Sequence, residues 1–228
     1  IGDLGLGQNP QLSKRLQDSD LVIALGTCLE ENVTKGYSLL NIPNPDVPIV
    51  HVHPDIQELG RVYQTTQVIN SDEGTFLTKA ISIDLRIPDA WTNWRESARA
   101  DYEAFQLSSS STSGVNLAKV MKTLRQALPN NAVVTNGAGN YTIWLHRFFR
   151  YRLPKTQVAP TSGAMGYSVP AAIASKIAEP SRTVVSLNGD GCFLMCGQEL
   201  ATAMQYGVKV IFLIVNNGIL GTIRMHQE

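Results

Sequence analysis

The fold is decided by the stretch Thr183-Val-Val-Ser-Leu-Asn-Gly-Asp-Gly191 and by the two segments that follow it, a helix-length segment and the run Val208-Lys-Val-Ile-Phe-Leu-Ile-Val-Asn-Asn217. Both quoted stretches begin with a short apolar run and end in glycine or asparagine, which is typical of buried strands. The segment between them, residues 193–206, ends at Gly207, a common helix terminator. A strand, a helix and a strand in this order form a right-handed crossover with parallel strands. The sequence therefore predicts an α/β fold.

Expected strands and helices also alternate along the rest of the chain. We expect strands at 21–25, 48–53 and 132–135 and helices at 91–105, 115–128 and 170–178. The pattern changes near residue 87, and the serine-rich stretch 108–114 predicts a flexible loop. We therefore expect two Rossmann-like, doubly wound parallel-sheet modules, a partial one at 1–86 and a second partial one at 87–228.

Composition and charge exclude several classes of function. With 43% hydrophobic and 17% charged residues, the 228-residue chain can bury a normal core. Lys plus Arg equals Asp plus Glu, 19 against 19, so no basic field attracts nucleic acid or anionic lipid. The longest clean apolar run, 210–215, is too short to span a bilayer, and three cysteines without a disulfide pattern fit a reducing compartment. We expect a cytoplasmic protein without nucleic-acid or membrane partners.

Polar residues gather where the last two expected strands end. Parallel strands end on the same edge of a sheet, so Asp190 and Asn217 should emerge side by side. A carboxylate, an amide oxygen and a carbonyl of the loop 218–221 suit Mg²⁺ that keeps part of its shell for phosphate. Gly189 and Gly191 allow a bulky anion to approach the backbone, and the following helix directs free N–H groups at it. The edge is therefore a candidate site for a metal-bound phosphate group.

The spacing of these residues resembles a known family. Gly189-Asp-Gly191, then 24 residues, then Asn216-Asn217 is similar to the cofactor fingerprint of the thiamine diphosphate-dependent decarboxylase and acetolactate synthase superfamily. The resemblance implies that Mg²⁺ is held by Asp190, Asn217 and the carbonyl of Ile219. It also implies that the diphosphate end of the cofactor contacts Gly189, Gly191, Cys192 and Asn217.

The resemblance extends upstream. The stretch Thr161-Ser-Gly-Ala-Met-Gly-Tyr-Ser-Val-Pro-Ala-Ala172 is similar to the family's segment beneath the aminopyrimidine ring. By this resemblance Met165 supports the cofactor in its bent conformer, and the carbonyl of Gly163 accepts a hydrogen bond from the cofactor's 4′-amino group. Plain core filling is the alternative for Met165. The loop ending in Asn140 and Tyr141 lies where family members contact the diphosphate.

The first part of the chain resembles the family's middle domain, a Rossmann-like module. His51 and His53 stand where the motif usually carries acidic residues, which weakens the case for a flavin cofactor such as FAD. Two histidines at this spacing could face a metal, but a partly exposed strand end is the favoured interpretation. Cys192 and Cys196, one helical turn apart, could likewise start a metal site, and two core-facing thiols are favoured there.

The resemblance implies thiamine diphosphate- and Mg²⁺-dependent cleavage or ligation of carbon–carbon bonds next to the carbonyl of a 2-oxo acid, as in acetolactate synthase. The alternatives are a simple 2-oxo acid decarboxylase, a flavin-linked oxidase, or a cofactor-binding relative without turnover. A dinucleotide dehydrogenase is disfavoured because a third glycine does not follow Gly137 and Gly139. Asn140, Tyr141 and Ser168 replace the Gln, His and Gly that acetolactate synthases commonly carry, so the substrate stays open.

The chain opens at Ile1 without an initiator Met and stops at Glu228, shortly after a strand, so we interpret it as a piece of a longer protein. In the family a glutamate on a separate pyrimidine-binding domain, contributed by another subunit, activates the cofactor. These residues contain no counterpart of that domain. We therefore expect no catalytic residue here, no activity from the chain alone, and a functional homodimer or homotetramer.

Overall fold

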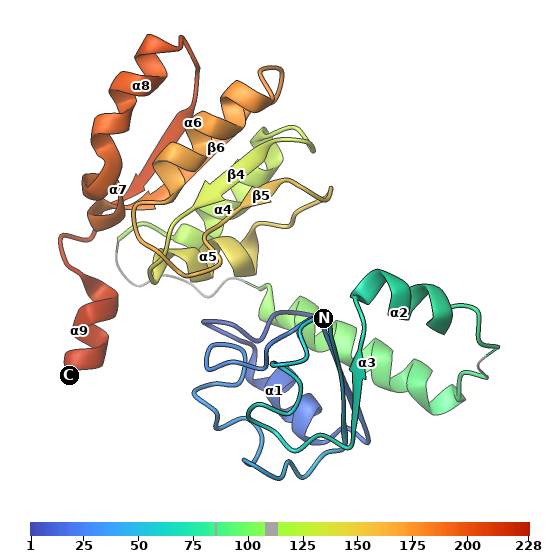
Figure 1. Cartoon of the computed structure of the whole chain (residues 1–228). Helices are drawn as coiled ribbons and strands as arrows, with labels where there is room; N and C mark the ends of the chain where they lie inside the picture. The colour runs from blue at the N-terminus through green and yellow to red at the C-terminus, as the bar shows by residue number, and fades with distance from the viewer. Residues whose placement is uncertain (85, 108–113) are drawn as a thin grey trace. The chain divides into compact units, whose positions relative to one another are not determined.

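The computed structural model describes residues 1–84, 86–107 and 114–228, and the chain folds as two compact units, Ile1–Leu107 and Ser108–Glu228 (Figure 1). Each unit is built around a parallel sheet, so the predicted α/β class is confirmed. The predicted serine-rich loop lies, except for Gly114, outside the described residues. Within the described part of the chain, none of the helices combines the length and the apolar character needed to cross a membrane.

The first unit has a parallel sheet in the order β1-β2-β3. Its elements are α1 (Pro10–Gln17), β1 (Val22–Leu25), β2 (Ile49–His53), β3 (Gln67–Asn70), α2 (Glu73–Ala80) and α3 (Asp89–Phe105). The strands predicted at 21–25 and 48–53 are confirmed, whereas β3 was missed because its apolar residues are flanked by Gln67 and Asn70. Turns, rather than helices, make up the β1–β2 connection, where prolines at 43, 45 and 48 oppose helix formation.

Helix α3 packs within the first unit, although it follows the predicted boundary near residue 87. It contacts α1, and the Arg15 guanidinium pairs with the Asp101 carboxylate at 2.6 Å. Asn9, which caps α1 through its side-chain oxygen, also donates to the Asp101 carbonyl. The compact unit thus ends at Leu107, and the domain boundary at 87 stays a prediction.

The second unit has a parallel sheet in the order β5-β4-β6-β7. Its elements are α4 (Leu117–Ala127), β4 (Val133–Asn136), α5 (Tyr141–Phe148), β5 (Gln157–Val158), α6 (Ser168–Ala178), β6 (Val184–Gly189), α7 (Asp190–Cys196), the 3₁₀-helix η1 (Gly197–Glu199), α8 (Leu200–Gln205), β7 (Ile211–Val215) and α9 (Gly221–Gln227). The strands predicted here and the helices predicted at 115–128 and 170–178 are present, with ends shifted by a few residues. The predicted strand–helix–strand crossover connects β6 to β7.

The crossover differs from the prediction in one respect, because the expected single helix at 193–206 is interrupted. Helix α7 begins at Asp190, directly after β6, and the chain leaves helical geometry at Cys196, with φ −137° and ψ 19°. Gly197 follows, and glycine is a poor helix former. A Cβ at Gly197 would lie 3.2 Å from the Phe193 ring, so the ring occupies the space of a side chain there.

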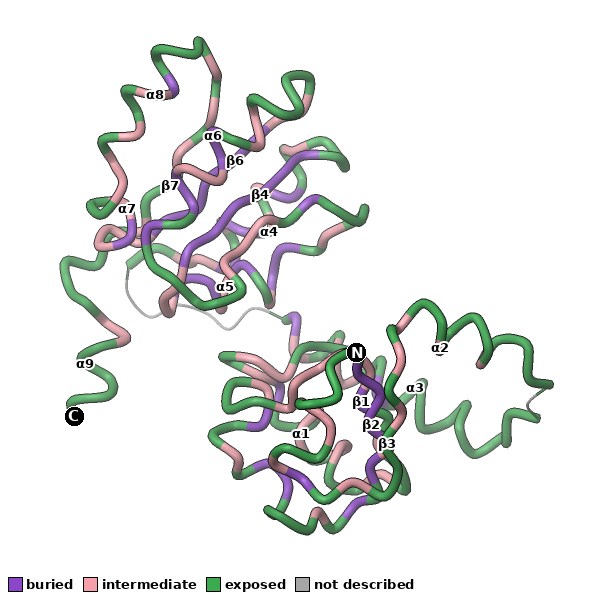
Figure 2. The backbone as a smooth tube through the Cα atoms, viewed as in Figure 1, coloured by how far each residue is buried: buried purple, intermediate pink, exposed green. Residues whose placement is uncertain are grey.

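Helices cover both faces of the central strands, which explains their nearly continuous apolar sequence. Side chains alternate along β4: Val133 packs with Ala172 of α6, and Val134 packs with Met121 of α4 and Leu145 of α5. Figure 2 shows the buried residues concentrated along β4 and β6. The sheet therefore has a rigid centre from which the loops at its carboxyl edge project.

A buried polar network fixes the start of α6. The Ser168 hydroxyl donates to the Asn188 side-chain oxygen, and Thr135 Oγ1 donates to the Ser168 carbonyl at 2.8 Å. The Asn188 amide donates to the Ser186 carbonyl at 3.1 Å. Thr135, Ser168, Ser186 and Asn188 are all fully buried. Breaking one of these hydrogen bonds would therefore leave a buried polar group without a partner, which destabilises the fold. The network anchors α6, and the segment 163–167 before it, to β4 and β6.

Candidate functional site

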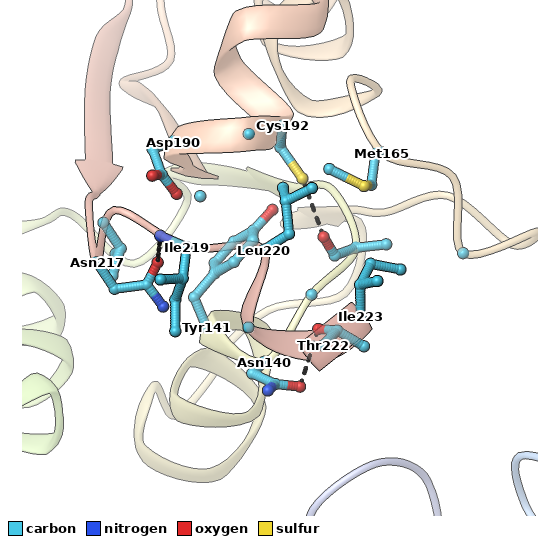
Figure 3. Close-up of a pocket in the computed structure, with 17 residues that line it drawn as sticks. Asn140, Tyr141, Met165, Asp190, Cys192, Asn217, Ile219, Leu220, Thr222 and Ile223 are labelled. Carbon is cyan, nitrogen blue, oxygen red and sulfur yellow. Dashed lines mark hydrogen bonds between the residues drawn. The ribbon is translucent and has the colours of Figure 1, made fainter. Parts of the chain in front are cut away.

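A pocket of about 260 Å³ opens at the carboxyl edge of the second unit's sheet (Figure 3). Its walls are the loops after β4, β6 and β7 and the segment before α6, because parallel strands deliver their following loops to one edge. Every residue that the sequence predicted for cofactor or metal contact lines it: Asn140, Tyr141, Gly163, Met165, Gly189, Asp190, Gly191, Cys192, Asn217 and Ile219. The structure therefore brings the predicted residues together, while their roles stay predictions.

Asp190 and Asn217 lie on the same side of the pocket (Figure 3). Gly189 and Val215 pair in register on β6 and β7, so both side chains follow strand ends that lie side by side. Asn217 Oδ1 accepts the N–H of Ile219 at 3.2 Å, which turns the loop and fixes the amide. An amide oxygen has two lone pairs, so Asn217 keeps one for a further partner.

An added side chain would meet neighbouring groups at two glycines, Gly189 at the end of β6 and Gly191 in the first turn of α7. A Cβ at Gly189 would lie 3.1 Å from the Tyr141 ring, and one at Gly191 would lie 2.9 Å from Leu220 Cδ2 and 3.4 Å from Met165 Cε. The space beside Gly191 belongs to the pocket itself. A ligand can therefore reach the backbone next to Asp190 without meeting a side chain.

Tyr141 and Cys192 join the β4 loop to the β6 turn. The Tyr141 hydroxyl accepts the N–H of Gly137 at 3.0 Å, and Cys192 Sγ donates to the Ala138 carbonyl at 2.9 Å. Tyr141 is 8% exposed, and burial, with Cys192 beside it as a second cause, raises the pKa of its phenol. The phenol is therefore neutral at physiological pH, and its hydroxyl holds the loop after β4 through the N–H of Gly137.

Met165 lies on the opposite wall of the pocket from Asn217 (Figure 3). Its side chain is 37% exposed, so the alternative of plain core filling is wrong. Gly163 (φ +66°) and Gly166 (φ +81°) bracket it, and both have the left-handed conformation that favours glycine. The turn they form presents the thioether to the cavity.

The histidine pair of the first unit differs from the expectation. His51 and His53 are 2% and 9% exposed, so the interpretation as a partly exposed strand end is wrong. They lie on β2, the middle strand of the sheet. His51 Nε2 donates to the Thr27 carbonyl at 2.8 Å, and His53 Nδ1 accepts the N–H of Asp55 at 3.0 Å. Among the described residues, no group of three or more His, Cys, Asp or Glu side chains is placed to hold a metal ion.

Sequence reasoning missed part of the pocket. Leu220, Thr222 and Ile223 also line it, and Thr222 Oγ1 donates to Asn140 Oδ1 at 3.0 Å. These two residues are 82 positions apart, and nothing local in the sequence links them. The site residues predicted from the sequence ended at Ile219, whereas the lining of the pocket continues to Ile223.

Glycine-lined backbone and oxygen donors at the carboxyl edge of a parallel sheet define an α/β ligand-binding protein. Residues 137–228 match the thiamine pyrophosphate enzyme, C-terminal TPP binding domain, and residues 1–80 match the thiamine pyrophosphate enzyme, central domain. The chain therefore belongs to the thiamine pyrophosphate enzyme family. Every residue that lines the pocket lies within 137–228, the part of the chain that matches the C-terminal domain.

Several relatives of the chain are named as acetolactate synthases. The chain is 31% identical to the acetolactate synthase of Mycobacterium leprae over 93% of its length, covering 35% of that protein. It is 32% identical to the acetolactate synthase large subunit of Corynebacterium glutamicum, over 93% of this chain and 34% of the relative. It is 29% identical to a probable acetolactate synthase large subunit of Methanocaldococcus jannaschii, over 100% of this chain and 40% of the relative. The chain thus spans about a third of the length of these relatives.

We predict that Gly191→Ala weakens thiamine diphosphate binding in the full-length protein while leaving its melting temperature close to wild type. The added methyl group would enter the cavity beside Leu220 and Met165, and alanine suits the first turn of α7. Titration calorimetry measures the affinity and scanning calorimetry the stability. Wild-type affinity in this variant would mean that the cofactor does not approach the backbone at Gly191.

Proposed function

We propose that this chain supplies the diphosphate- and magnesium-binding half of an active site that cleaves or forms carbon–carbon bonds next to the carbonyl of 2-oxo acids. One observation carries the proposal: Asp190 and Asn217 line one pocket at neighbouring strand ends of a domain that belongs to the thiamine pyrophosphate enzyme family. The acetolactate synthases among the relatives support a carboligase.

The residues present fit a metal-bound diphosphate. Asp190 offers an anionic oxygen, Asn217 an amide oxygen, and the loop carbonyl at Ile219 a third hard donor, the ligand types that Mg²⁺ prefers. Two protein side chains and one carbonyl leave positions in an octahedral shell for phosphate oxygens and water. The side-chain-free backbone at Gly189 and Gly191 gives the diphosphate room beside the metal.

Bound thiamine diphosphate supplies an electron sink, its thiazolium ring, for cleavage of the bond next to the carbonyl. The chain's own residues bind and orient it. Asp190 and Asn217 would hold the metal end, Met165 would support the rings from the opposite wall, and the Gly163 carbonyl would accept from the aminopyrimidine. Leu220 and Ile223 would exclude water from the pocket.

A second protein surface completes the proposed site. Asp190 is the one carboxylate among the described residues that line the pocket, and its proposed role is to bind the metal. A carboxylate that moves the proton of the aminopyrimidine must therefore come from elsewhere. The cavity, at about 260 Å³, is smaller than the roughly 300–1,000 Å³ typical of a site that encloses its ligand. Exposed Met165, Ile219 and Leu220 border it. We propose a homodimer or homotetramer in which another domain of the partner copy covers this face.

The metal assignment is tested by Asp190→Ala in the full-length protein. Removing an anionic ligand leaves the metal charge uncompensated, so magnesium-dependent binding of thiamine diphosphate should weaken by more than about 100-fold. Titration calorimetry with and without Mg²⁺ gives the affinity. Glu179→Ala, which removes an exposed carboxylate from the same unit, is the matched control and should bind normally. Equal affinities in the two variants would contradict the assignment.

The support role of Met165 is tested by Met165→Ala. Because the metal and diphosphate contacts are untouched, exchange of the cofactor's C2 proton should slow more than binding weakens. Proton exchange followed by NMR and the binding constant from calorimetry separate the two effects. A variant whose C2 proton exchanges at the wild-type rate would show that Met165 does not orient the cofactor.

The half-site proposal predicts that residues 1–228 expressed alone release no carbon dioxide from pyruvate with saturating thiamine diphosphate and Mg²⁺. The reason is that the pocket lacks a second carboxylate among its described lining residues and lies open on one side. The full-length protein is the positive control. Comparable turnover by the isolated chain would overturn the proposal that a second surface completes the site.

A further inference from the structure

The segment from Asn216 to the end of α9 has few contacts with the rest of the second unit. Residues 216–220 are exposed, as is α9 beyond its first two residues. Figure 1 shows α9 extending away from the sheet, and Figure 2 shows the segment as mostly exposed. A side-chain hydrogen bond ties it to the body of the unit, from Thr222 Oγ1 to Asn140 Oδ1 at 3.0 Å (Figure 3).

This hydrogen bond closes a short loop around the proposed metal ligands. The loop leaves β7 after Val215 and returns to the body at Thr222, and Asn217 and the Ile219 carbonyl lie between these two points. Gly221 lies between the two amides: a Cβ there would be 3.4 Å from Asn217 Nδ2 and 3.9 Å from Asn140 Nδ2. Fixing Thr222 against Asn140 therefore fixes the second end of the ligand loop.

The same bond uses the oxygen of the Asn140 amide. In the structure this oxygen faces Thr222, so the NH₂ group is left for other partners. Asn140 lines the pocket, where an NH₂ group attracts a diphosphate oxygen and an amide oxygen would repel it. Loss of the hydroxyl would remove this hydrogen bond and release the loop from Asn140.

We propose that Thr222 and Asn140 form a latch that holds the loop 217–221 in its metal-binding position, which makes Thr222 a positioning residue. This inference rests on the proposed function, since it assigns the latch to the proposed magnesium site. A loop that spends part of its time open binds its ligand in proportion to the closed fraction, so the latch raises metal affinity without contacting the metal.

The test compares Thr222→Val, which keeps the shape and removes the hydroxyl, with Thr222→Ser, which keeps the hydroxyl. The matched control is Thr202→Val on α8, because the Thr202 hydroxyl also donates to a side chain, Glu199, but does not line the pocket. All variants are made in the full-length protein. Amide hydrogen exchange of residues 217–224 is measured without metal or cofactor, and Mg²⁺ is titrated at saturating thiamine diphosphate.

Loss of one side-chain hydrogen bond should accelerate exchange of the loop amides about fivefold in Thr222→Val and weaken Mg²⁺ binding by about the same factor. Thr222→Ser should restore both values, and Thr202→Val should match wild type in the loop. Combining Asn140→Ala with Thr222→Val should accelerate exchange no more than Asn140→Ala alone, because both remove the same bond.

Wild-type exchange in Thr222→Val, or a serine variant that behaves like valine, would overturn the latch. The exchange measurement needs neither metal nor cofactor, so it judges the latch even if the proposed function fails. Conversely, Asp190→Ala that binds Mg²⁺ normally would overturn the metal assignment while leaving the exchange result unaffected. The two failures are therefore distinguishable.

Discussion

Parallel pairing of β6 with β7 places Gly189 opposite Val215, and the chemistry of the second unit depends on where these two strands stop. Asp190 begins a helix without an intervening loop, while Asn217 begins a turn closed by its own side chain. Because the two strands lie side by side, a carboxylate and an amide oxygen meet at one edge of the sheet. Displacing either strand end by one residue would separate them.

The rest of the unit holds that edge in place. Helices on both faces bury β4 and β6, and the network of Ser168, Asn188 and Ser186 fixes the start of α6, whose preceding turn presents Met165. Tyr141 fills the space that glycine leaves at position 189 and accepts a hydrogen bond from the β4 loop. Buried contacts thus hold three walls of the pocket in place: the loop after β4, the turn after β6 and the segment before α6. The fourth wall, residues 217–223, is exposed and weakly packed, so one hydrogen bond there can influence how the pocket binds.

The sequence predicted the features that follow from local rules. The β6–β7 crossover is recognisable from apolar runs and terminal glycines, and handedness then places Asp190 beside Asn217. Features that depend on distant residues were not predictable in this way. The burial of His51 is one example, because its ring donates to the carbonyl of Thr27, 24 residues earlier in the chain. The hydrogen bond of Thr222 requires the folded loop before its partner can be named.

The central claim is that this sheet edge holds a metal-bound diphosphate, and a crystal structure of the full-length protein with thiamine diphosphate and Mg²⁺ tests it most directly. The account predicts density for the metal in contact with side-chain oxygens of Asp190 and Asn217 and with the Ile219 carbonyl, and the diphosphate against the backbone at Gly189 and Gly191. A diphosphate bound elsewhere, or a metal held without Asp190, would contradict it.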